Sequence, residues 1–292
     1  MIQEKPVVGL ALGGGSARAL AHIGALKALE AKNLAPQVLA GTSYGAFIAA
    51  LYALVGSATA LEETLRNQNT LEFWEQALDF GLHKASLMQG QRAVRWLEHR
   101  YFHGATFADL SLPVAIACTD TGTGELRILR EGSVAKAIMA SCALPGLIGA
   151  VNWQGRWLVD GGLVATVPFA ALADMNTTLN IGIHTGVQEN SRFVHSLRRW
   201  HASALGRAWQ RQLLKVQGRS VWASFIRGLA RVQASYEQRI TAPEDALLIS
   251  IDPPLAWWDF HKISDAIAVG EQVTLGALER WQAQTPSAAS RE

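Results

Sequence analysis

Short apolar runs recur along the chain, and most are separated by segments with helical spacing. Runs rich in Val, Leu and Ile are typical of buried strands, and here they are "PVVGLAL" (6–12), "QVLA" (37–40), "LPVAIACTD" (112–120), "LNIGIH" (179–184) and "ALLISID" (246–252). The segment "GELRILR" (124–130) is also strand-like. Helical spacing is found near 16–34, 44–56, 59–79, 88–101 and 133–143. Continuous apolar strands that alternate with helices indicate an α/β fold with a mostly parallel central sheet.

The composition favours one large globular domain. Hydrophobic residues make up 49% of the 292 residues and charged residues 17%, which is enough to build a large core. No linker rich in Pro, Gly or Ser divides the chain, so we expect a single domain over 1–285 and a frayed tail at 286–292. No apolar run reaches the roughly 18 residues of a membrane span, and the N-terminus lacks the features of a signal peptide. These features, with Cys118 and Cys142 as reduced core residues, predict a cytoplasmic protein.

One segment carries most of the positive charge. Residues 188–240 hold ten Lys or Arg and two acidic residues, a net charge of +8, whereas the rest of the chain carries −6. Trp200, Trp209 and Trp222 are interleaved with these cations, which suits a basic helical elaboration that binds an anionic membrane surface peripherally. The alternative is a helix pair packed on the sheet with a solvated basic face. No nucleic-acid-binding motif is present, so we expect no nucleic-acid partner.

The sequence Gly-Thr-Ser-Tyr-Gly at 41–45 lies between a predicted strand and a predicted helix. Glycines two residues before and after Ser43 permit a sharp turn that pushes the serine hydroxyl outward beside the helix N-terminus. The alternative is a helix-capping serine in a glycine turn. The strand before it and the helix after it favour Ser43 as a nucleophile.

A second glycine cluster, Gly13, Gly14 and Gly15, ends the first predicted strand. Glycine lets backbone N–H groups approach a ligand closely, so these amides are candidates for an oxyanion hole. Arg18 lies one turn into the next helix and is placed to hold this loop or an anionic group. The spacing matches neither a dinucleotide-binding fingerprint nor a phosphate-binding P-loop.

Asp160 is the candidate base for the serine. It ends the apolar strand "RWLVD" and is followed by two glycines, a position where partial burial would raise its pKa. An Asx-turn is the alternative role for such an aspartate. His195, His201 and His261 do not follow a strand in a small-residue loop, and His22, on the first predicted helix, fits a packed or capping histidine better than a base. A Ser–His–Asp triad and a non-enzymatic regulator both stay open.

Four blocks in order, "GGGSAR", "GTSYG", "ASCALPG" and "DGG", resemble the patatin-like phospholipases, in particular the bacterial neuropathy-target-esterase type. The resemblance runs from Pro6 to Phe169 and returns in "DFHKISDAIAVGEQV". After "DGG", Ala165 and Thr166 stand where the family often has Asn and Pro.

The resemblance implies a three-layer α/β/α sandwich and a Ser–Asp dyad acyl hydrolase. It makes Ser43 the nucleophile and Asp160 the base, with an oxyanion hole formed by the Gly13–Gly15 amides and supported by Arg18. It implies no metal, no cofactor and no catalytic histidine. The expected substrates are ester-linked acyl chains of phospholipids, lysophospholipids or neutral lipids.

Overall fold

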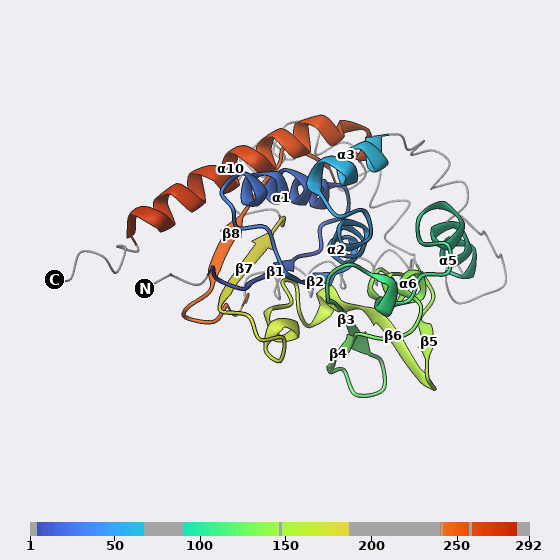
Figure 1. The fold of residues 1–292 in the computed structure, drawn as a ribbon. Coiled ribbons are helices and arrows are strands. Elements are labelled where there is room, and N and C mark those ends of the chain that lie inside the picture. Colours follow the sequence, from blue (N-terminus) through green and yellow to red (C-terminus); the bar gives the residue numbers. More distant parts are fainter. Residues whose placement is uncertain are drawn as a thin grey trace, which may run out of the picture.

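The computed structural model describes residues 5–66, 90–145, 148–186, 240, 242–256 and 259–284. They form an α/β fold around an eight-stranded sheet (Figure 1). Its strand order is β5 (Val151–Trp153), β6 (Arg156–Asp160), β3 (Val114–Asp120), β2 (Val38–Thr42), β1 (Val8–Leu12), β7 (Leu179–His184) and β8 (Leu247–Ser250), with β4 (Leu126–Leu129) paired to β3. Strands β3, β2, β1, β7 and β8 are parallel, which confirms the predicted α/β class and mostly parallel sheet.

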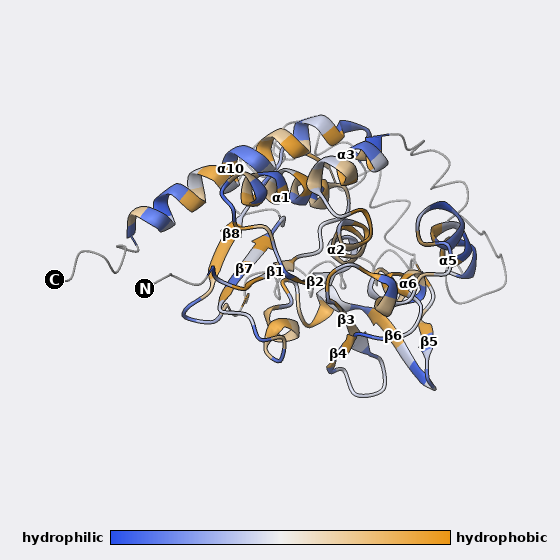
Figure 2. Ribbon diagram, viewed as in Figure 1, coloured by the Kyte–Doolittle hydropathy of each residue, from blue (hydrophilic) through white to orange (hydrophobic). Residues whose placement is uncertain are grey.

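Helices cover one face of the sheet. They are α1 (Ala21–Ala31), α2 (Tyr44–Val55), α3 (Ala58–Arg66), α6 (Val134–Ser141) and α10 (Ile263–Gln284). Alternate strand residues such as Leu10, Leu39 and Ile116 point into this core and are fully buried. Figure 2 shows the same pattern, since α2 is hydrophobic while hydrophilic residues lie along α10 and α5 (Gln91–Leu97).

The other face of the sheet carries small side chains. Ala11, Ala40 and Ala115 lie on it and pack with the 3₁₀ helix η5 (Phe169–Leu172). A Cβ atom at Gly182 of β7 would lie 2.2 Å from the Phe169 ring, so this helix approaches the sheet too closely for a larger residue. Small strand residues thus let the chain that follows β6 return across the sheet.

Helices α1 and α10 pack side by side at unusually short range (Figure 1). A Cβ atom at Gly24 would lie 2.0 Å from the carbonyl oxygen of Ile267, and one at Gly270 would lie 2.0 Å from that of Ala21. Glycine is therefore required on both helices at this crossing. The C-terminal helix in this way supports α1, the helix that follows the glycine loop.

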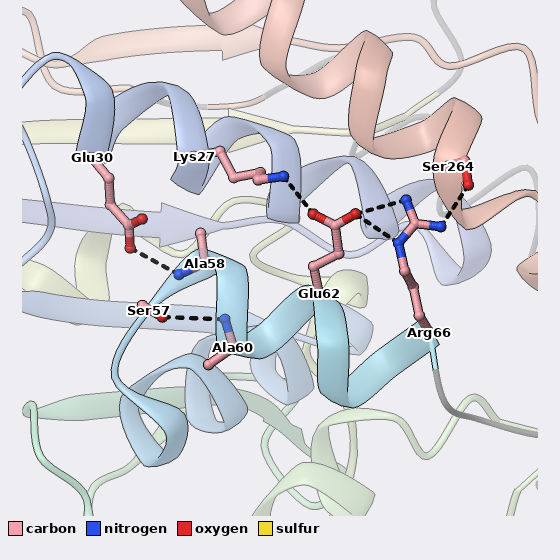
Figure 3. A network of polar contacts seen from close by, with 8 residues as sticks. All are labelled: Lys27, Glu30, Ser57, Ala58, Ala60, Glu62, Arg66 and Ser264. Carbon is pink, nitrogen blue, oxygen red and sulfur yellow. Dashed lines mark hydrogen bonds and ion pairs between the residues drawn. The ribbon is translucent and has the colours of Figure 1, made fainter.

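A polar network joins α3 to its neighbours (Figure 3). Glu62 of α3 accepts hydrogen bonds from Lys27 of α1 and from Arg66, and Arg66 also donates to the Ser264 hydroxyl of α10 at 2.7 Å. Glu30 accepts a 2.9 Å hydrogen bond from the Ala58 amide at the start of α3. These contacts fix α3 against the same helix pair.

The observed elements differ from the predicted ones in three places. The helix expected over 16–34 begins as a 3₁₀ helix, η1 (Ser16–Leu20), before it continues as α1. The segment expected to be helical at 88–101 is α5, followed by a π-helical turn (Glu98–Phe102). Strand β5 was not predicted, because it has only three residues and pairs with β6 through a tight turn.

Several predictions fall outside the described ranges. They are the helical pattern after 66, nearly all of the basic segment 188–240 and the tail at 286–292. The prediction of a single domain over 1–285 stays a prediction for the same reason. In the part of the chain that the structure describes, no single helix is long and apolar enough to cross a membrane, and α2 and α3 pass such a test only as a pair bent by 113°.

Candidate active site

Ser43 stands on a sharp turn between β2 and α2. Its backbone has φ 54° and ψ −128°, a conformation that costs a non-glycine residue about 1–3 kcal/mol. The turn is tight because its two glycines contact main chain: a Cβ at Gly41 would lie 2.4 Å from Cα of Ala46, and one at Gly45 would lie 2.4 Å from the carbonyl oxygen of Gly13. The spacing of the two glycines around Ser43 therefore has a direct steric cause.

A second serine holds this turn in place. The backbone N–H of Ser43 donates a 2.7 Å hydrogen bond to Oγ of Ser141, and the Ser141 hydroxyl donates to the carbonyl oxygen of Ala117 at 2.6 Å. Ser141 ends α6 and is fully buried. Sequence reasoning gave it no role, although it lies in "ASCALPG", because the spacing does not tell which strand and turn the end of that helix meets.

Asp160 lies at hydrogen-bond distance from the nucleophile candidate. Oγ of Ser43 donates to Oδ2 of Asp160 at 2.8 Å. The other carboxylate oxygen, Oδ1, accepts the backbone N–H of Gly162 at 2.7 Å, and Thr119 donates to the Asp160 carbonyl oxygen at 2.8 Å. Both the side chain and the backbone of Asp160 are thus held, and the residue is only 4% exposed.

Burial raises the pKa of the Asp160 carboxyl to about 6. The hydrogen bonds from Gly162 and Ser43 favour the ionised form and lower the pKa, but they only partly offset the loss of hydration. A carboxyl group with a pKa near neutral pH is ionised at pH 7 and still basic enough to take up a proton.

The three glycines of the loop differ in what their amides do. The Gly13 amide donates to the carbonyl oxygen of Ile183 at 2.9 Å and so continues the pairing of β1 with β7. The Gly14 amide lies 3.3 Å from the carbonyl oxygen of Thr166, a long hydrogen bond. Within the described residues the Gly15 amide has no acceptor. The candidates for the oxyanion hole are therefore the amides of Gly14 and Gly15, because the Gly13 amide is already hydrogen-bonded in the sheet.

Gly14 is the loop residue that contacts the nucleophile candidate. A Cβ atom at Gly14 would lie 3.3 Å from Cβ of Ser43 and 4.0 Å from its Oγ. Arg18, in η1, uses its side chain to bind main chain: its Nε donates to the carbonyl oxygen of Thr185 at 3.2 Å. Arg18 therefore ties the helix after the loop to the end of β7.

None of the described histidines hydrogen-bonds Ser43 or Asp160. His22 is fully buried in α1, where Nε2 lies 2.8 Å from the carbonyl oxygen of Gly13, and burial lowers the pKa of its imidazole to about 4. His261 is exposed in the 3₁₀ helix η6 (Phe260–Lys262). Two further candidates, His195 and His201, lie outside the described residues.

The loop after Asp160 is held through its main chain. Thr42 donates to the carbonyl oxygen of Ala165 at 2.8 Å, and the Gly14 amide approaches that of Thr166. Contacts through carbonyl oxygens depend little on side-chain identity. Ala165 and Thr166 can therefore make them, although patatin-like phospholipases often have Asn and Pro at these positions. In the described part of the chain no group of three or more His, Cys, Asp or Glu is arranged to hold a metal ion.

A serine on a strand-to-helix turn is the nucleophile arrangement typical of α/β serine hydrolases, and in this chain its hydroxyl bonds directly to a buried carboxylate. Comparison with protein families narrows this class. The chain belongs to the patatin-like phospholipase family, whose model matches residues 10–173, more than half of the sequence.

Curated relatives carry the resemblance over nearly the whole chain. The chain is 29% identical over 293 residues to patatin-like phospholipase domain-containing protein 6 of Homo sapiens, covering 94% of this chain and 20% of that protein. It is 27% identical over 274 residues to neuropathy target esterase sws of Drosophila melanogaster, covering 88% of this chain and 19% of that protein. Lysophospholipase NTE1 of Yarrowia lipolytica is 27% identical over 281 residues, covering 91% and 19%. The chain thus spans about a fifth of the length of these relatives.

Solved structures share the fold. VipD from Legionella pneumophila has a TM-score of 0.56 and 13% identity, covering 94% of this chain and 66% of that chain. ExoU of Pseudomonas aeruginosa, in its complex with SpcU, has a TM-score of 0.50 and 17% identity, covering 94% and 52%.

Proposed function

We propose that this protein is a serine acyl hydrolase that cleaves ester-linked fatty acyl chains of phospholipids, lysophospholipids or related lipid esters. The observation that carries the proposal is the 2.8 Å hydrogen bond from Ser43 to the buried carboxylate of Asp160. The substrate class follows from the relatives, whose names describe a neuropathy target esterase and a lysophospholipase. Membership of the patatin-like phospholipase family supports the same class of reaction.

In the first half of the reaction Ser43 Oγ attacks the ester carbonyl carbon while its proton passes to Oδ2 of Asp160. The carbonyl oxygen becomes an oxyanion, which the amides of Gly14 and Gly15 bind, while Gly13 anchors the loop to β7. The start of α2 lies beside Ser43, and its dipole also favours negative charge there. Collapse of this intermediate releases the alcohol, which takes the proton from Asp160, and leaves an acyl group on Ser43.

In the second half a water molecule gives a proton to the Asp160 carboxylate and attacks the acyl carbon. The fatty acid leaves as Ser43 regains its proton from Asp160. One carboxylate thus acts as a base and then as an acid in each half of the reaction, and the scheme requires no metal and no cofactor.

The basic segment 188–240 supports a peripheral contact with anionic membrane surfaces, where lipid substrates reside. Its net charge of +8 and its interleaved tryptophans are the features that favour this role. With a cytoplasmic location, the contact would be at the inner face of the membrane.

Hydrolysis of a panel of lipid esters by the wild type and by Ser43→Ala tests the proposal. The panel holds lysophospholipids, diacyl phospholipids, monoacylglycerols and triacylglycerols, with released fatty acid as the readout. We expect cleavage of at least one class by the wild type and only background release by Ser43→Ala. Equal release by both proteins would refute the proposal.

A further inference from the structure

Three consecutive glycines leave the peptide planes of the loop with little steric restraint on their orientation. Orientation matters here, because a peptide that turned over would present a carbonyl oxygen to Ser43 in place of an N–H group. That oxygen would repel the oxyanion which the amides are proposed to stabilise. A loop of this kind needs specific hydrogen bonds to hold its peptide planes.

The plane between Gly13 and Gly14 is held by His22. The carbonyl oxygen of Gly13 lies 2.8 Å from Nε2 of this fully buried histidine. Since a carbonyl oxygen only accepts, Nε2 carries the proton, and Nδ1 has no partner among the described residues. The peptide is trans, so the N–H of Gly14 points in the opposite direction, away from His22.

The plane between Gly14 and Gly15 is held by Thr185. Its hydroxyl donates to the carbonyl oxygen of Gly14 at 2.9 Å, so the N–H of Gly15 points away from it. Thr185 is fully buried just after β7, and its own carbonyl oxygen accepts the bond from Arg18. A Cβ atom at Gly15 would lie 2.4 Å from the Thr185 hydroxyl oxygen, so glycine at this position is what permits the contact.

We infer that His22 and Thr185 are positioning residues that lock the two successive peptide planes of the proposed oxyanion hole. The Gly14 N–H is then held only by a long 3.3 Å bond to the Thr166 carbonyl oxygen, which an oxyanion can replace, and the Gly15 N–H has no acceptor among the described residues. Each binds one carbonyl oxygen of the loop, so the N–H of the same trans peptide points the opposite way, and neither residue needs to touch the substrate. The inference rests on the proposed function and adds two residues, 163 positions apart, to the machinery of that site. It also gives Arg18 a definite task, which is to hold the backbone of Thr185.

Of the two positioning residues, Thr185 gives the more specific test, because its hydroxyl can be removed with little change in side-chain volume. Thr185→Val removes the donor at nearly constant volume, and Thr185→Ser keeps it. Thr64→Val is the matched control, because the Thr64 hydroxyl donates to the Ala60 carbonyl oxygen at 2.8 Å within α3. The assays are hydrolysis of p-nitrophenyl butyrate and inhibition by a trifluoromethyl ketone, which forms an oxyanion adduct with a serine nucleophile.

We expect Thr185→Val to lower kcat about 10–100-fold with little change in KM, somewhat less than the loss of a whole oxyanion-hole donor. The affinity of Thr185→Val for the trifluoromethyl ketone should fall by a similar factor. Thr185→Ser and Thr64→Val should keep a kcat and a ketone affinity close to those of the wild type. The same comparison applies to His22→Leu, which removes the donor, and His22→Gln, which keeps an N–H group. If His22→Leu fails to fold, the Thr185 variants decide the question.

The outcomes separate this inference from the proposed function. If hydrolysis depends on Ser43 but Thr185→Val retains kcat and ketone affinity, the inference is wrong and the proposed function stands. Equal losses in Thr185→Val and Thr185→Ser would also overturn it, because they would indicate a packing role. Hydrolysis that survives Ser43→Ala would overturn the proposed function and the inference with it.

Discussion

Ser43 Oγ and Asp160 Oδ2 lie 2.8 Å apart although their residues are 117 positions apart in the chain. The sheet register brings them together. Thr42, just before the serine, pairs with Ala117 of β3, and the next residue of β3, Cys118, pairs with Asp160 of β6. Strand β3 extends three residues past the partner of Thr42, and the antiparallel β6 runs back along this extension and ends opposite Cys118, so Asp160 lies level with the end of β2.

The pH dependence of kcat/KM should report the Asp160 carboxyl. With a pKa of about 6, activity should rise with pH through 6 and fall about tenfold per unit well below it. At pH 6.5 roughly a quarter of the group is protonated, so some loss occurs near the pKa of an ordinary histidine. The profile should be measured from pH 4.5 to 9, and a flat profile over that range would contradict the assignment.

Asp160→Asn should be more stable than the wild type at high pH. Burial raises the folded-state pKa above the unfolded value of about 3.9, so the stability contributed by Asp160 is full below pH 4 and is lost as pH rises through 6. The variant has no charge to bury and should gain about 1–3 kcal/mol at pH 8, and little at pH 4. Urea unfolding at both pH values measures this difference. A variant less stable than the wild type at pH 8 would contradict it.

The crossing of α1 and α10 should tolerate no Cβ atom at Gly270. Gly270→Ala places that atom 2.0 Å from the Ala21 carbonyl oxygen, and the resulting shift should cost about 1–3 kcal/mol. Gly276→Ala, in the same helix, meets only the end of the Arg280 side chain at 3.5 Å and should be neutral or stabilising by up to about 1 kcal/mol. Urea unfolding compares the two variants, and equal effects would refute the close approach.

Binding to anionic vesicles should depend on the basic segment. We expect sedimentation with vesicles of mixed phosphatidylcholine and phosphatidylglycerol, and weaker binding as salt rises, since exposed charges are screened within about 10 Å at 0.1 M. Replacing Arg198, Arg199 and Arg207 by Gln should weaken binding more than the charge-matched replacement of Lys5, Arg127 and Arg280. If as much protein sediments with neutral vesicles as with anionic ones, or if none binds to either, only a packing role is left for the segment.

Local patterns predicted the elements and the two central site residues, because those depend on short stretches of sequence. The strand before Ser43, the helix after it and the strand that ends at Asp160 each carry their own periodicity or glycine turn. The glycine turn made Asp160 the candidate base for Ser43, but a triad stayed open until the family resemblance favoured a dyad, since periodicity gives no strand order. Strand β5 was missed because three residues hold too little pattern.

The supporting contacts could not be predicted because each joins distant parts of the chain. Ser141 meets the turn at Ser43 only once α6 has packed beside β3, and Thr185 meets Gly14 only once β7 pairs with β1. The same pairing engages the Gly13 amide, which the glycine pattern had grouped with those of its two neighbours. The glycine pattern alone could not show that strand pairing engages the Gly13 amide.

The central claim is that Asp160, without a histidine, activates Ser43. Its most direct test is the rate at which a fluorophosphonate probe labels Ser43 in the wild type, Asp160→Asn and alanine variants of His195, His201 and His261, with Ser43→Ala as the blank. Loss of general-base assistance should slow labelling of Asp160→Asn about 10²–10⁴-fold, while circular dichroism shows a folded protein. The three histidine variants should label at nearly the wild-type rate. Near-normal labelling of Asp160→Asn, together with a histidine variant as unreactive as Ser43→Ala, would contradict the dyad and establish a triad instead.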